Sequence, residues 1–462
     1  MTDEQLKATR PQQAEEPRPP FLSRLNARGF RMLQPLDATA VLGAIVVLHA
    51  VRFGLPRAGE PWPTYPLHEY AVGFLGATVV LLAVFYFGGL YERELRLGSR
   101  PRLPQIVALT AIGILVWGAI ALISGRYLIP RQNLAILAVV IPLVVAANRR
   151  WARWLRIQRE GPPRVLLVGA PDEVNLARKH VQETTQKAQI AGEAASAEGL
   201  LARVEATRAT DVLLLSGRTL DDIYPEPLSS LESRAVGVLQ IVRPADSLLG
   251  LRNVREIGGM PFVPLNSHVM PVSQVRLKRG LDLLGLLLLA PITVPLTLFV
   301  AAYVAIVGGR PLLYTQRRIG KDGRLFHLIK FRTMYPDAEA ETGPVQAAKN
   351  DPRVVPGLRW VRDTRLDELP QMWNVLKGEM SLVGPRPERP ELAERYERLI
   401  PGYSRRHETP PGITGLAQVH GRYHTDPEYK LGHDLQYLVN WSPVMDAQIL
   451  LRTIFVIVTR QG

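Results

Sequence analysis

The sequence contains no cysteine, which excludes disulfide bonds, thiolate metal sites and a cysteine nucleophile. Acidic residues are also few: 42 Asp and Glu stand against 56 Lys and Arg, so the net charge is +14. This basic excess suits anionic lipid headgroups and phosphorylated substrates as well as nucleic acid. Aromatic residues make up only 7% of the chain, and it has no recognised nucleic-acid-binding motif. We therefore predict no nucleic-acid partner.

Hydrophobic residues, by contrast, make up 47% of the 462 positions. Residues 1–33 are polar and proline-rich, which predicts a disordered cytoplasmic tail rather than a signal peptide. Residues 34–150 contain apolar stretches at about 36–53, 70–90, 103–123 and 134–147. The first three approach the length that crosses a bilayer, and the fourth does so if Arg131 and Asn148 lie at the interfaces. We predict a bundle of four transmembrane helices.

Arginines beside these stretches indicate the orientation of the bundle. Twelve of them flank its two ends and the connection after the second stretch: Arg24, Arg28, Arg31, Arg93, Arg96, Arg100, Arg102, Arg149, Arg150, Arg153, Arg156 and Arg159. The opposite side has Arg52, Arg57, Arg126 and Arg131. By the positive-inside rule, both ends of the bundle are predicted to lie in the cytoplasm.

Residues 160–268 alternate short β-type runs with helical segments, which predicts a small parallel, Rossmann-like α/β domain. Strands are expected at 165–169, 211–215 and 236–242, and helices near 173–182 and 197–208. The first strand ends at Gly169, but the residues that follow lack the further glycines of a dinucleotide-binding loop. A structural or regulatory role is therefore favoured over nucleotide binding.

Residues 281–307 are apolar throughout but are interrupted by Pro291 and Pro295, and both flanks are basic. A helix broken at proline can enter the bilayer and return, which leaves both basic flanks in the cytoplasm. We predict such a re-entrant hairpin. The alternative is a fifth, kinked span, which would place everything after Gly308 outside.

Asp367 and Glu368 are the main candidates for chemistry. Apolar residues at near-helical spacing, with Pro370 in the first turn, predict that a helix begins at or just before Asp367. The positive end of a helix holds carboxylates ionised and also attracts phosphate oxygens. An arbitrary Asp-Glu pair is most often a solvated helix cap, so the interpretation depends on the neighbouring residues.

Those neighbours supply positive charge. Lys330 and Arg332 alternate along a predicted strand at 325–331, which places both cations on one face, where they suit a diphosphate. Arg386 lies between two prolines on stiff backbone, which suits bidentate phosphate recognition. Arg353 and Arg362 precede the carboxylate helix, and residues 337–350 are expected to form a mobile loop beside the site.

Taken in order, these motifs resemble the bacterial sugar transferase family, whose members are monotopic phosphoglycosyltransferases that start glycan assembly on polyprenyl phosphate. The resemblance covers residues 273–462 and rests on Lys278-Arg279, Gln316/Arg318/Gly320, Lys330-Phe331-Arg332-Thr333-Met334, Leu366-Asp367-Glu368-Leu369-Pro370-Gln371, Met380-Ser381-Leu382-Val383-Gly384-Pro385-Arg386-Pro387-Glu388 and Pro411-Gly412-Ile413-Thr414-Gly415. The preceding bundle and α/β domain are similar to the large members that initiate capsule, exopolysaccharide or O-antigen synthesis. A membrane protein of mixed α and α/β class is therefore expected.

The resemblance implies a mechanism in which a UDP-sugar binds with Mg²⁺ and Asp367 attacks its β-phosphorus. UMP leaves, and polyprenyl (undecaprenyl) phosphate then attacks the aspartyl phospho-sugar intermediate. Asp367 would also contact the metal, whereas Glu368 positions the metal, orients Asp367 or acts as a base. The residues that match the family's phosphate- and nucleotide-binding motifs are Lys330, Arg332, Thr333, Arg353, Arg362 and Arg386. The implied location is the cytoplasmic face of the bacterial inner membrane.

Further features of the sequence qualify the resemblance. The family's hairpin often bends at Ser-Pro, whereas this chain has Ala290-Pro291. Ser442-Pro443 predicts the start of a helix to about Thr459, which lies at the membrane interface or packs on the catalytic core. Membrane lipids and a second copy in a homodimer are further expected partners. The rival function is a catalytically silent membrane scaffold for glycan assembly.

Overall fold

The computed structural model describes residues 33–53, 67–92, 97, 102–126, 128–182, 188–216, 222–244, 246, 254–265, 270–336, 338, 351–420 and 426–459. The predicted tail and most of the predicted loop at 337–350 lie outside these ranges. The chain divides into one unit of residues 1–93 and 101–160 and a second unit of residues 94–100 and 161–462.

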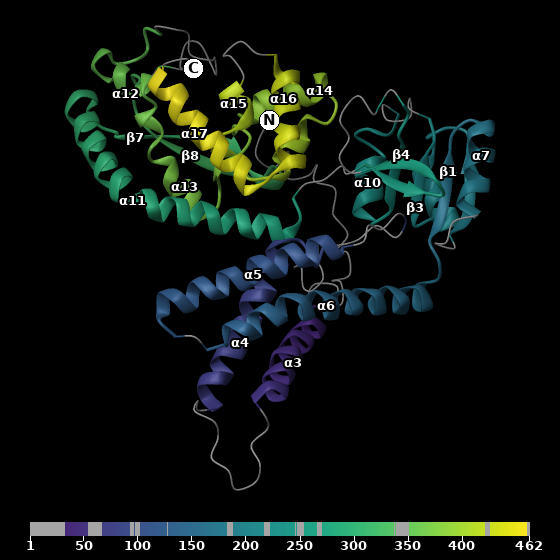
Figure 1. The fold of residues 1–462 in the computed structure, drawn as a ribbon. Helices are drawn as coiled ribbons and strands as arrows, with labels where there is room; N and C mark the ends of the chain where they lie inside the picture. The colour runs from purple at the N-terminus through teal and green to yellow at the C-terminus, as the bar shows by residue number, and fades with distance from the viewer. Residues whose placement is uncertain are drawn as a thin grey trace, which may run out of the picture. The chain divides into compact units, whose positions relative to one another are not determined.

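The described part of the first unit consists of four apolar helices packed together (Figure 1), which confirms this part of the sequence prediction. They are α3 (Leu33–Phe53), α4 (Leu67–Phe87), α5 (Leu103–Ser124) and α6 (Arg131–Glu160). All four contain segments that are long and apolar enough to cross a membrane. Helix α6 extends beyond the predicted end at residue 147 because no glycine or proline lies between that residue and Gly161, whose φ of 76° suits the end of a helix.

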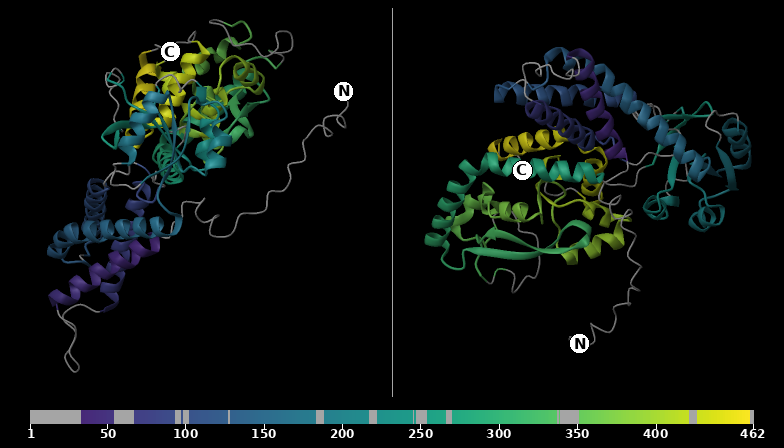
Figure 2. Two further views of the ribbon diagram at one scale, coloured as in Figure 1. Left: turned by 90° about the vertical axis from the view of Figure 1, so that its right-hand side faces the viewer. Right: turned by 90° about the horizontal axis from the view of Figure 1, so that it is seen from below.

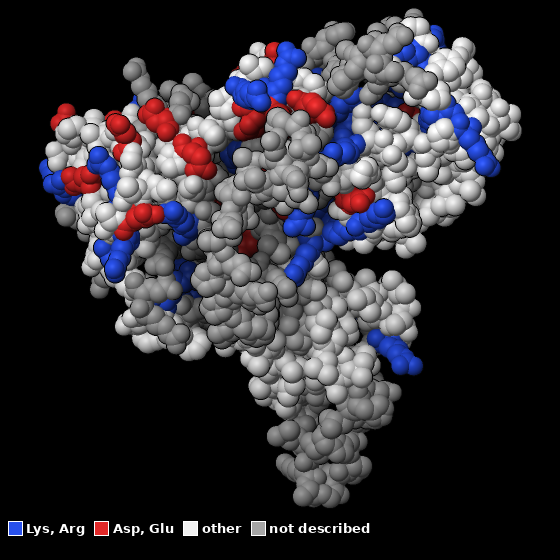
Figure 3. Space-filling view, turned by 180° about the vertical axis from the view of Figure 1, so that it is seen from behind, with Lys and Arg blue, Asp and Glu red and all other residues white. Residues whose placement is uncertain are grey.

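The interior and the exterior of this bundle are both apolar. Val41, Ile45 and Phe85 are buried between the helices, whereas Val79 and Leu115 are exposed. In Figure 3 the described surface of the bundle shows few charged side chains. An exposed apolar surface of this kind is expected where lipid, rather than water, surrounds the helices.

The α/β domain contains a six-stranded sheet with the order β2-β1-β3-β4-β6-β5. The strands are β1 (Arg164–Val168), β2 (Gln189–Ala194), β3 (Asp211–Leu214), β4 (Gly237–Ile241), β5 (Arg255–Ile257) and β6 (Met260–Pro264), and the helices are α7 (Pro171–Gln182), α8 (Leu200–Thr207) and α10 (Leu228–Ser233). The first four strands pair in parallel; β1, β3 and β4 correspond to the predicted strands, whereas β2 was not predicted. The expectation of a wholly parallel sheet was wrong, because β6 runs antiparallel to β4 and β5 antiparallel to β6. Gly258 and Gly259, both with positive φ, form the tight turn between β5 and β6.

Helix α11 (Val272–Gly308) follows, and it differs from the predicted hairpin at residues 281–307. Pro291 and Pro295 lie inside one continuous helix, which bends but is not interrupted (Figures 1 and 2). Each proline removes one backbone hydrogen bond and leaves the turns on either side intact. Thr293 and Thr297 donate hydrogen bonds to the carbonyls of Leu289 and Thr293, a pattern that favours bending.

Residues 313–459, called the catalytic region below, are built around a β-hairpin. The elements include β7 (Leu313–Ile319), β8 (Leu325–Phe331), the 3₁₀ turns η3 (Pro356–Leu358), η4 (Leu366–Glu368) and η5 (Tyr403–Glu408), α12 (Arg359–Asp363), α13 (Gln371–Lys377), β9 (Ser381–Val383), α14 (Pro390–Leu399), β10 (Gly412–Thr414), α15 (Leu416–His420), α16 (Pro427–Asn440) and α17 (Pro443–Thr459). Strands β7 and β8 pair antiparallel, and β9 and β10 pair in parallel. Phe326, Leu328, Val375 and Tyr437 are buried in the core of this region.

Helix α17 begins where the sequence predicted, and the Ser442 hydroxyl accepts a hydrogen bond from the Met445 N–H as its cap. Ile449 is buried in the core, whereas Leu451 and Phe455 are exposed. One side of this helix therefore packs on the core, as one of the two expected settings requires, and the other side exposes apolar side chains.

Candidate active site

Lys330 and Glu368 form the central ion pair of the candidate site. The Lys330 Nζ lies 2.8 Å from the Glu368 Oε1, and both side chains are largely buried. Lys330 is the second-last residue of β8, and Glu368 ends the η4 turn. The predicted strand and the predicted carboxylate segment are therefore brought together in the fold.

The pKa values of Asp367 and Glu368 are shifted in opposite directions. Burial, together with the Glu368 charge, raises the pKa of Asp367 to about 6. Burial also acts to raise the pKa of Glu368, but the positive charges of Lys330 and Arg386 outweigh it and lower that pKa to about 2. At neutral pH both groups are ionised, and Asp367 is the more basic carboxylate. A basic, ionised carboxylate is the better nucleophile of the two.

The backbone around these carboxylates differs from the predicted helix start. Asp367 and Glu368 lie in the 3₁₀ turn η4, and α13 begins only after Pro370. Arg365 precedes the turn with a φ of 57°, so the chain reverses there. Leu366 and Leu369 pack against the buried cluster around α12 and α11, which fixes the turn from its apolar side.

A small pocket adjoins Glu368. It is lined by Arg318, Leu328, Lys330, Glu368, Gln371, Arg386, Pro387, Gly412, Ile413 and Gln418. Three of these residues are cationic, so the pocket suits a group that carries several negative charges, such as a diphosphate. Glu368 and the predicted phosphate-binding residues Lys330 and Arg386 thus line one pocket, whereas Asp367, next to Glu368 in the η4 turn, and Arg362 are not among its lining residues.

Two turns that carry pocket-lining residues, Gly384–Pro387 and Pro411–Gly415, are hydrogen-bonded to each other. The Gly412 N–H donates to the Pro385 carbonyl at 2.9 Å, and the Gly384 N–H donates to the Thr414 carbonyl at 2.8 Å. A Cβ on Gly412 would lie only 2.1 Å from the Gly384 nitrogen, so the two turns approach closely because both positions are glycine. This contact gives the Pro411–Gly415 turn a structural role.

Arg318 and Arg365 contribute charge that the sequence analysis did not assign. Burial and the neighbouring Arg386 charge lower the pKa of Arg318 to about 10, and its Nη1 donates to the Pro387 carbonyl at 2.9 Å. Arg365 helps to lower the pKa of both carboxylates, as Arg362 does for Asp367. Arg318 belongs to a motif that the sequence analysis noted, but only the fold shows which arginine of that motif reaches the pocket.

Arg332, Thr333 and Arg353 are not among the residues that line the pocket. The Arg332 guanidinium is buried and donates to the carbonyls of Gly308, Gly309 and Pro311 at the end of α11. The Arg353 guanidinium pairs with the Asp351 carboxylate, with Nη2 at 2.6 Å from Oδ2. Thr333 is buried. Their observed contacts are therefore structural.

The described residues contain no group of three or more His, Asp or Glu side chains arranged to hold a metal ion. The adjacent carboxylates of Asp367 and Glu368 nevertheless fit Mg²⁺ that is bound together with a diphosphate. Magnesium in such sites takes one or two protein carboxylates, and substrate phosphates and water supply the other ligands.

The loop after β1 offers little room for a second phosphate site in the α/β domain. The Glu173 carboxylate accepts a hydrogen bond from the Ala170 N–H at 3.1 Å. A Cβ on Gly169 would lie 3.0 Å from the same carboxylate oxygen. A negative side chain thus occupies the turn where a pyrophosphate would bind in a dinucleotide-binding fold, which favours a structural or regulatory role.

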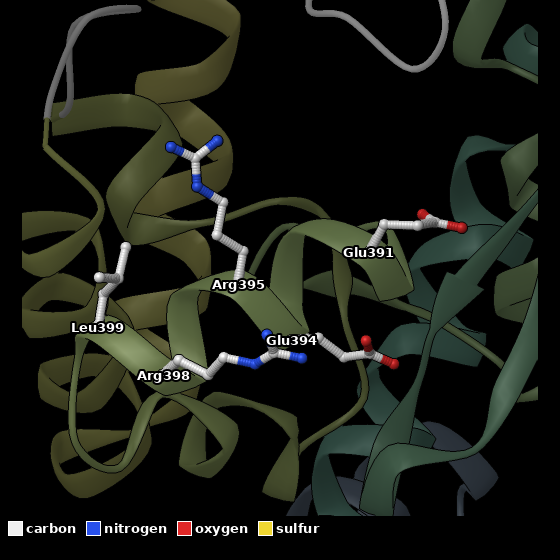
Figure 4. A pocket seen from close by; sticks show the side chains of 5 residues that line it. All are labelled: Glu391, Glu394, Arg395, Arg398 and Leu399. Atoms are coloured by element: carbon white, nitrogen blue, oxygen red, sulfur yellow. The ribbon is translucent and has the colours of Figure 1, made fainter.

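A further hollow lies over α14 and is formed by residues of that helix alone, namely Glu391, Glu394, Arg395, Arg398 and Leu399 (Figure 4). Glutamates precede arginines by four positions, a spacing typical of a solvated helix face. Figure 4 shows the Arg395 side chain pointing away from those of the glutamates. We assign no site to this hollow.

The sequence of the C-terminal part of the chain is similar to known proteins. Residues 273–460 match the family described as Bacterial sugar transferase. The chain is 40% identical over 205 residues to the UDP-glucose:undecaprenyl-phosphate glucose-1-phosphate transferase of Klebsiella pneumoniae, covering 43% of this chain and 44% of that protein. It is also 40% identical over 189 residues to the UDP-N-acetylgalactosamine-undecaprenyl-phosphate N-acetylgalactosaminephosphotransferase of Aeromonas hydrophila, covering 40% and 44%.

A third relative is the UDP-galactose-lipid carrier transferase of Erwinia amylovora, which is 40% identical over 200 residues, covering 40% of this chain and 41% of that protein. The similarity thus spans less than half the length of these relatives. Their names specify different sugars, so this similarity does not select the sugar.

Proposed function

Because residues 273–460 belong to the bacterial sugar transferase family, we propose that the protein transfers a sugar 1-phosphate from a UDP-sugar to undecaprenyl phosphate. This reaction would be the first membrane step of exopolysaccharide, capsule or O-antigen assembly. The observation that carries the proposal is the pairing of Lys330 with Glu368 beside the more basic Asp367, at the edge of a cationic pocket.

The reaction consists of two displacements at one phosphorus atom. The Asp367 carboxylate attacks the β-phosphorus, an O–P bond forms, and the bond to the bridging oxygen breaks to release UMP. An oxygen of undecaprenyl phosphate then attacks the same phosphorus and displaces the Asp367 carboxylate. The products are UMP and undecaprenyl-diphospho-sugar, and the enzyme is regenerated. Covalent catalysis of this kind divides one difficult transfer into two easier ones.

The cations around the pocket bind the anionic substrate and stabilise charge as the bridging bond breaks. Lys330, Arg318 and Arg386 lie in the pocket lining, so we assign the diphosphate to them. Mg²⁺ held by Asp367 would add positive charge at the diphosphate. Lys330 also keeps Glu368 ionised, which retains a negative charge beside Asp367 and keeps Asp367 basic.

We further propose that α11 is re-entrant, with both ends at the cytoplasmic face. Its N-terminal part is fixed to the catalytic region, since the Lys278 Nζ lies 2.8 Å from the Asp446 carboxylate. Its C-terminal part is fixed to the same region, since Val300 and Val304 pack against Phe331. A helix that crossed the bilayer would place these ends on opposite sides of the membrane, which both contacts disfavour.

The surface of α11 supports this placement. Leu287, Leu288 and Ile292, beside the two prolines, are exposed, and the exposed apolar residues Leu451 and Phe455 belong to α17. Seen from below in Figure 2, α11 and α17 lie next to each other on one side of the catalytic region. An apolar side of two helices suits insertion into one leaflet of the bacterial inner membrane.

The test is UMP release from a panel of UDP-sugars by the full-length protein in nanodiscs, with and without undecaprenyl phosphate. Turnover that needs the lipid, favours one sugar and is lost in Asp367→Asn supports the proposal and identifies the sugar. Absence of release with every sugar, in protein shown to be folded and inserted, supports the silent scaffold instead.

A further inference from the structure

Gln418 has a buried side-chain amide with no partner among the described residues. Neither its Nε2 nor its Oε1 is hydrogen-bonded to another described protein group, and both atoms are shielded from solvent. Leaving a buried donor and acceptor unpaired lowers stability, so native proteins rarely retain such groups without a use. Gln418 lies in α15 and lines the pocket beside Glu368.

The position of this amide is fixed by the backbone beneath it. The Gln418 N–H donates to the Gly415 carbonyl at 3.0 Å. A Cβ on Gly415 would lie 2.1 Å from the Gly384 carbonyl oxygen, so α15 starts directly against the turn that carries Arg386. The start of α15, which carries Gln418, therefore lies beside the turn that carries Arg386.

The pocket contains two kinds of surface. Lys330, Arg318 and Arg386 supply positive charge, whereas Pro387, Gly412, Ile413 and Leu328 are neutral. A charged diphosphate matches the first surface. The second suits an uncharged group, and Gln418 adds hydrogen-bond donors and an acceptor to it.

We propose that Gln418 binds the uracil base of the UDP-sugar, an inference that rests on the proposed function. The edge of uracil presents an N–H between two carbonyl oxygens, so a side-chain amide can donate to one carbonyl and accept from the N–H in one plane, as amides do with other bases. The amide has no described protein partner to fix its orientation, so it contributes affinity without distinguishing uracil from cytosine.

The experiment compares Gln418→Leu with Gln436→Leu, a control at an exposed position of α16. Binding of UMP and of ribose 5-phosphate to the full-length protein in nanodiscs is measured by titration calorimetry. We expect Gln418→Leu to weaken UMP binding by about tenfold and to leave ribose 5-phosphate unchanged, because only UMP carries the base. The KM for the UDP-sugar should rise with little change in kcat, since the base contact is the same in the ground and transition states.

Thermal unfolding gives an independent readout. Without ligand, Gln418→Leu should be at least as stable as the wild type, because an unpaired buried amide has been removed. If that variant does not fold, Gln418→Met, which keeps the length of the side chain, replaces it and should give the same loss of UMP binding.

Three results would overturn the inference: unchanged UMP binding, equal weakening of UMP and ribose 5-phosphate, or a raised KM for the UDP-sugar with UMP binding intact. The last would place the amide against the sugar. Failure of the proposed function is distinguishable, because UMP binding that depends on Gln418 would persist in a protein that releases no UMP from any UDP-sugar.

Discussion

The Nζ of Lys330 lies 2.8 Å from the Oε1 of Glu368, so the cation of β8 is paired with the second carboxylate of the Asp367-Glu368 sequence. Together with Arg386, Lys330 lowers the pKa of Glu368 and keeps this carboxylate ionised. Burial, and then the Glu368 charge, raise the pKa of the adjacent Asp367, although the Lys330 charge acts in the opposite direction. Asp367 is therefore the more basic carboxylate and the candidate nucleophile.

Asp367→Asn should abolish turnover and stabilise the fold. The amide is a poor nucleophile, so we expect kcat to fall by about a thousandfold or more. The buried Asp367 carboxylate has a raised pKa, so its ionisation at neutral pH opposes folding, and its neutral isostere should raise the Tm by a few degrees.

Asp363→Asn, at an exposed acid in α12, is the matched control and should change neither quantity. UMP release and thermal unfolding of both variants in nanodiscs provide the test. Retention of wild-type turnover by Asp367→Asn would remove Asp367 from the nucleophile role.

The decrease of kcat/KM at low pH, the acid limb of its pH profile, should follow the protonation of Asp367. Because burial and the Glu368 charge raise its pKa to about 6, kcat/KM should fall as the pH drops through about 6 and the nucleophile is protonated. The Arg362 charge lowers this pKa, so Arg362→Gln should shift the limb to higher pH.

Arg359→Gln is the control for this shift, because it removes a cation from the same short helix and is not among the main influences on Asp367. The measurement is kcat/KM between about pH 5 and pH 9 for the three proteins. A limb at the same pH in Arg362→Gln and the wild type would argue against Asp367 as the titrating group.

The sequence predicted much of this site because its local signals agree with the fold. Lys330 faces Glu368 because strand alternation holds up to the end of β8 at Phe331. Arg332 lies one residue past that end, where alternation no longer applies, and its side chain turns to the end of α11. Gln418 reaches the pocket through the close approach of two glycine turns, which no local pattern in the sequence reveals.

The course of α11 was also only partly predictable from local signals in the sequence. The prolines correctly indicated a bend in α11, but the sequence alone did not show that the turns on either side of them stay helical. The β5–β6 hairpin was missed because its strands are short, at three and five residues, and carry little periodic signal.

Arg332 should act on stability rather than on substrate binding. Its guanidinium donates to carbonyls of Gly308 and Pro311, so Arg332→Met leaves buried acceptors unpaired and should lower the Tm by about 5 °C. Arg332→Lys should restore little, since an ammonium does not reproduce the planar fork.

Arg324→Met, at an exposed position, is the control and should leave the Tm unchanged. The KM for the UDP-sugar, measured below the unfolding temperature, separates the two roles. A large rise in KM with an unchanged Tm would return Arg332 to the phosphate-binding set.

The re-entrant course of α11 can be tested directly because the chain has no native cysteine. Single cysteines can replace Arg276, an exposed residue near the start of α11, and Arg310, an exposed residue just after its end. In oriented inner-membrane vesicles, a membrane-impermeant maleimide should label both from the cytoplasmic side, and Leu288→Cys should resist labelling because it lies in lipid. Arg126→Cys, on the predicted opposite side of the bundle, reports vesicle orientation. Labelling of the two flanks from opposite sides would establish a fifth span and would place Asp367 away from cytoplasmic UDP-sugars.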